Sequence, residues 1–147
     1  FFYPINDHTF FKVNTIFREI IKKKKNKPKD IKIKGRNFII QNYFEGSAKF
    51  NFDDLCGNPF GAEDYIKIAE QCNFIFVNKV PNFNDENSDK QNRFITLIDI
   101  LYDKKIPIMI TADFNYINFS SSKKLNDPYK RTISRLFELT SPKFSIS

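Results

Sequence analysis

Apolar residues recur at helical spacing in the middle of the chain, where they form one stripe: Phe94, Leu97, Ile98 and Leu101. A charged turn at residues 103–105 ends this stripe. The apolar run that follows, residues 106–110, is typical of a strand covered on both faces. A helix that leads into such a strand through a short link is half of a βαβ unit. Residues 93–112 therefore predict the centre of a sheet with parallel strands.

The first third of the chain predicts one helix and then antiparallel strands. The helix runs from about residue 8 into the lysines at 22–25, and Pro28 prevents its continuation. Its apolar stripe consists of Phe10, Val13, Phe17, Ile20 and Ile21. From residue 31 the apolar period changes to two, and glycine-containing turns near positions 35 and 46 separate three strands. This pattern predicts a three-stranded antiparallel meander.

The remainder of the chain predicts alternating helices and strands. A short helical piece at 53–57 precedes a helix at 62–72 and a buried strand at 73–77. The polar and acidic residues 82–92 predict an exposed loop before the central helix. After a second polar loop, 113–126, the last helix extends from Tyr129 to about Thr140, with Asp127 as its cap and Pro128 at its first position.

These elements predict the α/β class: an antiparallel hairpin or meander followed by βαβ-type helix–strand units. The length of 147 residues suits one domain, and a hydrophobic content of 41% suffices for a core. We expect three parts: an N-terminal helix and basic linker at 1–29, the meander at 30–57, and an α/β portion at 58–147.

The formal net charge of +7 comes mainly from lysine. Lysines spread over a surface favour solubility, whereas arginine is the usual choice for fixed phosphate contacts. The basic balance therefore disfavours direct nucleic-acid binding. The run Lys22–Lys25 is typical of a solvated helix end, and contact with phosphate or acidic lipid is the alternative.

The two cysteines, Cys56 and Cys72, predict reduced buried thiols because neither has a second cysteine or a histidine at metal-ligand spacing. No apolar run has the length of a membrane span, and no signal peptide is present. The chain begins in mid-pattern with Phe1-Phe2-Tyr3-Pro4 and lacks an initial methionine. We expect it to be a fragment of a longer protein.

No catalytic motif and no metal site can be recognised in the sequence. With four glycines, neither G-x-x-x-x-G-K-[ST] nor G-x-G-x-x-G occurs, and G-x-S-x-G is also absent. His8 is the sole histidine. The carboxylate pairs Asp99/Asp103 and Asp53/Asp54 could perform acid–base chemistry, but a solvated helix face and a helix cap explain them more simply.

Three arginines are the best candidates for function: Arg93, Arg131 and Arg135. In a lysine-rich chain they suggest positions where lysine would not serve, and Arg131 and Arg135 are four residues apart on one helix face. Guanidinium groups could stabilise a nucleotide phosphate or pair with carboxylates. The sequence leaves both roles open and favours structural pairing.

Several blocks in order resemble one family of P-loop ATPases. They are residues 50–56, 61–66, Val80-Pro81, 93–103, 131–136 and the turn Gly35-Arg36. The sequence is similar to the C-terminal part of the bacterial cell-division ATPase ZapE and its mitochondrial relatives, the "ATPase family gene" (AFG-one-like) proteins. It departs from that pattern at Asn92-Arg93, where the family tends to carry two arginines.

The resemblance implies an AAA+-like ATPase that hydrolyses ATP with Mg²⁺ in cell division or protein quality control. The Walker A and Walker B groups would lie upstream, so the fragment itself should be inactive, with no catalytic residue, metal or cofactor of its own. Arg93, Arg131 and Arg135 become nucleotide-sensing candidates. The implied partners are ATP, a client or division protein, and further copies of the same chain.

The implied location is the cytoplasm of a bacterium, or the mitochondrion if the source is eukaryotic. The alternative function is a non-catalytic module that binds a protein or an anionic surface, including the periphery of a membrane. That reading rests on the basic run Lys22–Lys25 and the hairpin.

Overall fold

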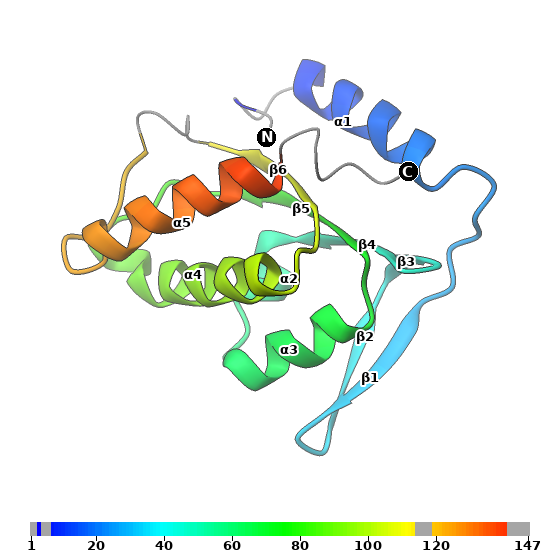
Figure 1. The fold of residues 1–147 in the computed structure, drawn as a ribbon, viewed down its shortest axis with the longest axis horizontal. Coiled ribbons are helices and arrows are strands. Elements are labelled where there is room, and N and C mark those ends of the chain that lie inside the picture. The colour runs from blue at the N-terminus through cyan, green and yellow to red at the C-terminus, as the bar shows by residue number, and fades with distance from the viewer. Residues whose placement is uncertain (1–2, 4–6, 114–118, 141–147) are drawn as a thin grey trace.

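The computed structural model describes residue 3, residues 7–113 and residues 119–140. Its centre is a four-stranded sheet in the order β3-β4-β5-β6, and a separate hairpin, β1-β2, extends from one end (Figure 1). β3 and β4 are antiparallel, whereas β4, β5 and β6 are parallel. The strands are β1 (Lys29–Ile33), β2 (Arg36–Ile40), β3 (Asn42–Phe44), β4 (Ser47–Asn51), β5 (Phe74–Val80) and β6 (Ile108–Ala112).

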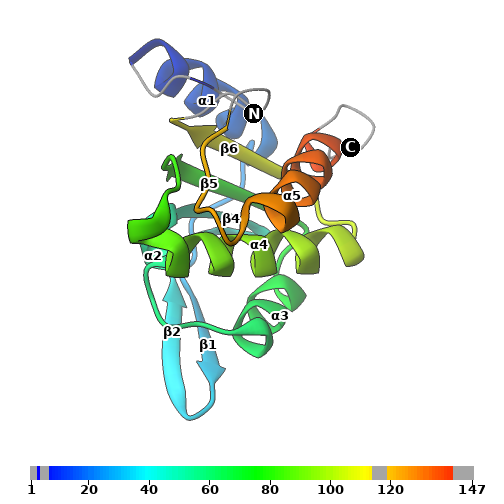
Figure 2. The ribbon, with the colours of Figure 1, turned by 90° about the vertical axis from the view of Figure 1, so that its left-hand side faces the viewer.

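Helices cover both faces of this sheet. α1 lies on one face and α2 to α5 lie on the other side, as Figures 1 and 2 show. The alternation of β5 explains this arrangement, because Phe74 and Phe76 pack with Phe17 of α1 while Ile75 and Val77 enter the main core. The helices are α1 (Asp7–Ile20), α2 (Phe52–Cys56), α3 (Ala62–Glu70), η1 (Asp85–Asn87), α4 (Ser88–Asp103) and α5 (Asn126–Leu139).

The central helix and strand are confirmed. The four residues of the predicted stripe have no exposed surface in α4: Phe94, Leu97, Ile98 and Leu101. α4 ends in a Schellman motif, in which the Ile106 N–H bonds to the Leu101 carbonyl (2.9 Å) and the Lys105 N–H bonds to Tyr102 (3.2 Å). Lys105 therefore adopts the left-handed conformation (φ 55°) that glycine usually occupies there.

The α/β class is confirmed, but the three predicted antiparallel strands do not form one meander. The chain bends at Gln41, so the predicted second strand becomes β2 and β3, which belong to different sheets. The apolar pattern changes phase at this point: Phe38, Ile40 and Tyr43 all pack in or against the main core, but Tyr43 follows Ile40 at an odd spacing. Successive side chains of a strand point to opposite faces, so one straight strand cannot direct all three to the same core.

The predicted exposed loop at 82–92 is wrong over most of its length. The Asn84 side chain accepts hydrogen bonds from the N–H groups of Glu86 (2.8 Å) and Asn87 (3.3 Å), and this cap begins the helical turn η1. α4 then starts at Ser88, and Phe83 and Gln91 are fully buried. The polar composition hid a capped helix start.

The last helix also begins earlier than predicted. α5 starts at Asn126, and Leu125 occupies the cap position in place of Asp127. Pro128 lies within the first turn, where its missing N–H costs no helical hydrogen bond.

Candidate functional site on helices α4 and α5

Two of the three candidate arginines meet at one carboxylate. Arg135 Nη1 lies 2.6 Å from Asp99 Oδ1, and Arg131 Nη2 lies 3.9 Å from Asp99 Oδ2. Asp99 sits beside the buried stripe of α4, on the side that packs against α5. The i, i+4 spacing of the two arginines places both on the same side of α5, as the sequence predicted.

The two arginines differ in how firmly they are held. The Arg135 side chain is 27% exposed and its guanidinium also lies 4.8 Å from the centre of the Tyr102 ring. The Arg131 side chain is 61% exposed, and its contact with Asp99 is longer than a hydrogen bond. Arg135 is therefore fixed between the helices, whereas Arg131 can turn toward solvent.

Tyr102 extends this cluster to the end of α5. Its hydroxyl donates a hydrogen bond to Glu138 Oε2 at 2.9 Å. This hydrogen bond, followed by the negative charge of Glu138, raises the pKa of Tyr102. Sequence reasoning missed Asp99, Tyr102 and Glu138 as partners because their meeting depends on how α4 and α5 pack.

Arg93 lies elsewhere. Its Nη1 donates a hydrogen bond of 3.0 Å to the carbonyl of Cys56, the last residue of α2. It stands six residues before Asp99 on α4, about 9 Å along the helix axis. The Cys56 thiol beside this contact is buried, which raises its pKa to about 12. Arg93 thus caps α2, apart from the other two arginines.

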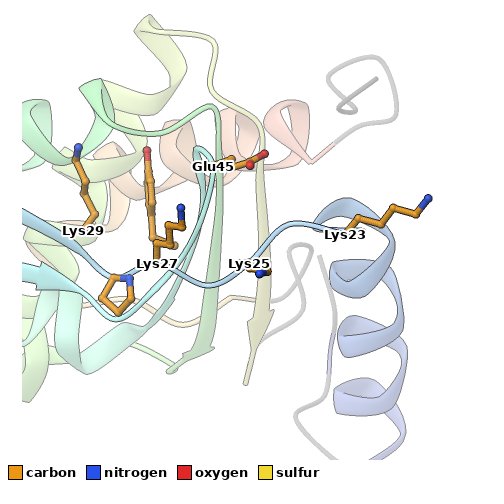
Figure 3. Close-up of a pocket in the computed structure, with 7 residues that line it drawn as sticks. Lys23, Lys25, Lys27, Lys29 and Glu45 are labelled. Carbon is orange, nitrogen blue, oxygen red and sulfur yellow. The ribbon is translucent and has the colours of Figure 1, made fainter.

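A second feature is a groove of about 440 Å³ lined by basic residues, which we call the basic groove (Figure 3). Its lining comprises Lys23, Lys25, Lys27, Pro28, Lys29, Tyr43 and Glu45. Of the predicted run Lys22–Lys25, two members therefore line it. The sequence did not indicate the contributions of Lys27, Lys29 and Tyr43.

Hydrogen bonds to β3 hold the lysine segment in place. The Lys27 N–H bonds to the Tyr43 carbonyl (2.9 Å), and the Asn26 side chain accepts from the Tyr43 N–H (3.0 Å). The Tyr43 hydroxyl donates to the carbonyl of Gln71. One wall of the basic groove is therefore fixed to the sheet.

Neither metal ligation nor membrane spanning is indicated by the described part of the chain. In residues 7–113 and 119–140, no three His, Cys, Asp or Glu side chains gather where they could hold a metal ion. No helix in those ranges is long and apolar enough to cross a membrane.

Comparison with known proteins identifies the family. The sequence model of the AFG1-like ATPases matches residues 1–146. The chain belongs to the AFG1-like ATPase family. This membership agrees with the resemblance drawn from the sequence blocks, and it supports the assignment of the mixed sheet and its helices to an AAA+-like P-loop fold.

The relatives of this family member are considerably longer than the chain. Lactation elevated protein 1 homolog B of Danio rerio is 31% identical over 103 residues, which are 69% of this chain and 20% of the relative. An uncharacterised protein of Schizosaccharomyces pombe is 32% identical over 84 residues, which are 57% of this chain and 18% of the relative. Cell division protein ZapE of Escherichia coli is 20% identical over 141 residues, which are 96% of this chain and 38% of the relative. No solved structure matches the chain.

Proposed function

We propose that this chain is the C-terminal α/β portion of an ATPase, and that it acts together with a P-loop half of the same polypeptide. The observation that carries the proposal is the match to the AFG1-like ATPases over residues 1–146. The relatives extend well beyond the matched region, and neither a Walker A nor a Walker B motif is written in these residues. ATP and Mg²⁺ would be bound by that other half.

Within this proposal, Arg131 is the residue that reaches the nucleotide or an adjoining subunit. Its exposed side chain and long contact with Asp99 leave its guanidinium available for a phosphate. Arg135 would position α5 against α4 through Asp99, so that Arg131 is presented correctly. Arg93 would hold α4 to the end of α2 through its hydrogen bond to the Cys56 carbonyl.

Alanine substitutions in the full-length polypeptide test these roles. We expect Arg131→Ala to lower ATP turnover at least tenfold without changing thermal stability, since a guanidinium that meets a phosphoryl group contributes strongly to phosphoryl transfer. Arg135→Ala should lower both stability and turnover. Lys130→Ala, next to Arg131 and equally exposed, is the matched control. Unchanged turnover in the Arg131, Arg135 and Arg93 variants would refute the proposal.

The cellular role that we propose, in cell division or protein quality control, is taken from the relatives. One relative is named a cell division protein, and the resemblance also suggests protein quality control. A division or client protein, together with further copies of the chain, would be the partners. The compartment would be the bacterial cytoplasm or the mitochondrion.

A second function is favoured by the basic groove. Four lysines and one glutamate line it, so an anionic surface would be attracted. In this alternative the chain is a non-catalytic binding module, including at the periphery of a membrane. Sedimentation with vesicles containing phosphatidylserine tests it at about 50 and 300 mM salt.

The charge-reversed variant Lys25→Glu/Lys27→Glu/Lys29→Glu should no longer sediment. The matched control reverses Lys67, Lys104 and Lys124, which are exposed elsewhere. Equal sedimentation of both variants would exclude the basic groove as the binding surface.

A further inference from the structure

The outer edge of β2 in the β1-β2 hairpin is open. β2 pairs with β1, and among the described residues no other strand pairs with it. A two-residue turn at Lys34 (φ 50°) and Gly35 (φ 77°) closes the hairpin, so Ile33 and Arg36 form its first hydrogen-bonded pair.

The register then determines which backbone groups point outward. Hydrogen-bonded and non-hydrogen-bonded pairs alternate along an antiparallel ladder. Ile31↔Phe38 is a hydrogen-bonded pair, whereas Lys32↔Asn37 and Asp30↔Ile39 are not. The N–H and C=O groups of Asn37 and Ile39 therefore point away from β1. They offer four hydrogen-bonding groups to a neighbouring strand.

A groove runs along this same edge. Two hollows of about 250 and 160 Å³ share Phe38 and Asn58, and we call them together the β2 groove. Between them they are lined by Ile33 of β1, by residues 36–39, 41 and 42, and by residues of β4, α2 and the loop after it. The β2 groove therefore follows residues 36–39 of β2.

The β2 groove has an aromatic floor and polar walls. The Phe38 ring packs edge-on against Phe60 (5.3 Å between centres) and stacks at 6.4 Å on Phe50. The carboxamides of Gln41, Asn42 and Asn51 line the walls. Carboxamides both donate and accept hydrogen bonds, which suits the backbone of an extended peptide.

The hairpin is held rigidly, so the edge is pre-organised. Ile31, Ile33 and Ile40 are buried in the main core. Arg36 lies 4.0 Å from the buried carboxylate of Asp64, and Figure 2 places β1 on the side of α3 and β2 on the opposite side. Ile39 remains 47% exposed on the open strand. A rigid edge loses little conformational entropy when a strand is added.

Charge selects the kind of strand that can bind. The hairpin carries four basic residues, Lys29, Lys32, Lys34 and Arg36, and one acid, Asp30. A second copy of the chain would bring the same basic residues alongside, and like charges on neighbouring strands disfavour pairing. Arg36 at one end of the β2 groove has a side chain that is 54% exposed, and it complements an acidic side chain.

We propose that the open edge of β2 binds an extended acidic segment of a partner protein by β-strand addition. The segment pairs with the backbone of Asn37 and Ile39. Its residue opposite Phe38 is apolar and packs on the aromatic floor, and an acidic residue at one end lies near Arg36. This surface is separate from the contacts of Arg131 and Arg135 with Asp99, and the proposal does not depend on ATP hydrolysis.

The test uses fluorescence anisotropy of the intact chain with a labelled peptide, Glu-Val-Thr-Val-Thr-Glu. Asn37→Pro removes one outward N–H, and the hairpin ladder is kept because that N–H does not bond to β1. We expect binding to weaken about fivefold or more, the value of one net hydrogen bond. Lys32→Pro is the matched control, since its N–H points to the opposite edge, and it should bind as the wild type does.

Three further measurements use the wild-type chain, so they do not depend on how the variants fold. A peptide with N-methylated valines, and a peptide with lysine in place of both glutamates, should each bind the wild-type chain at least fivefold more weakly. Hydrogen–deuterium exchange should slow at residues 36–40 when the original peptide is added. Binding that is insensitive to N-methylation, absence of binding, or pairing of two copies through β2 would overturn the proposal.

Discussion

Removing the contact between Asp99 and Arg135 should measurably loosen α5 from α4. The two groups are separated by 2.6 Å, and each side chain is about two-thirds shielded from solvent, at 31% and 27% exposure. A charge-assisted hydrogen bond of this kind contributes about 1.5–3 kcal/mol when buried, and partial exposure reduces that to about 1–2 kcal/mol. Arg135→Ala also removes the contact with the Tyr102 ring, worth about 0.5–1 kcal/mol.

Urea unfolding followed by circular dichroism measures this loss. We expect Arg135→Ala to lower the free energy of unfolding by about 2 kcal/mol, which corresponds to about 4–8 °C in Tm for a chain of this size. A double-mutant cycle with Asp99→Ala isolates the pair and should give a coupling energy of about 1 kcal/mol. The cycle of Asp99 with Arg131 should give less than about 0.5 kcal/mol, because that contact is long and exposed.

Equal coupling energies for the two arginines would refute this reasoning. They would mean that Arg131 is held as firmly as Arg135. Arg135 could then no longer be distinguished, as the residue that positions α5, from Arg131, as the residue available to a phosphate.

Three other predictions follow from particular contacts. Lys105→Gly should raise the free energy of unfolding by about 0.5–1 kcal/mol in urea, since glycine adopts the left-handed conformation at the end of α4 without steric cost; a loss of stability would contradict it. Gln91→Ala should cost about 2 kcal/mol, because this buried side chain donates to Ser121 Oγ (2.6 Å) and accepts from the Ser122 N–H (3.1 Å); Asn92→Ala, at the next and exposed position of α4, is the control. Burial raises the pKa of the Cys72 thiol to about 12, so the folded chain keeps a proton that the unfolded chain loses near pH 9. Each such thiol should lower stability between about pH 9 and 12 by up to 1.4 kcal/mol per pH unit, and Cys56 titrates in the same way. Cys72→Ala should therefore reduce the slope measured for the wild type by that amount, and an unchanged slope would contradict the prediction.

Sequence periodicity predicted the elements whose apolar residues alternate strongly. Phe94, Leu97, Ile98 and Leu101 identified α4, and the short run after the turn identified β6. The start of α4 could not be found in this way, because the cap formed by Asn84 is polar and resembles a loop. Local composition does not distinguish a capped helix start from an exposed turn.

Periodicity could not predict which strands pair, for a different reason. Alternation indicates which side chains face the core but does not indicate the neighbouring strand. β4 pairs with β3 on one side and in parallel with β5 on the other. The bend at Gln41 keeps β2 out of this sheet, and that leaves its outer edge open. The edge and the β2 groove could therefore be found only in three dimensions.

The candidate site was partly predictable. The spacing of Arg131 and Arg135 placed them on one face, but their partner Asp99 comes from another helix. The basic groove likewise needs the attachment of Asn26 and Lys27 to β3. In both cases the sequence supplied the charged residues, and tertiary packing determined what they meet.

ATP hydrolysis, compared between the full-length polypeptide and this chain alone, tests the central proposal most directly. Both would be assayed at the same concentration with ATP and Mg²⁺, and phosphate release would be measured. The full-length polypeptide should hydrolyse ATP, and the 147-residue chain should release no phosphate above the background rate. Hydrolysis by the chain alone, or none by the full-length polypeptide, would contradict its assignment as the C-terminal portion of an ATPase.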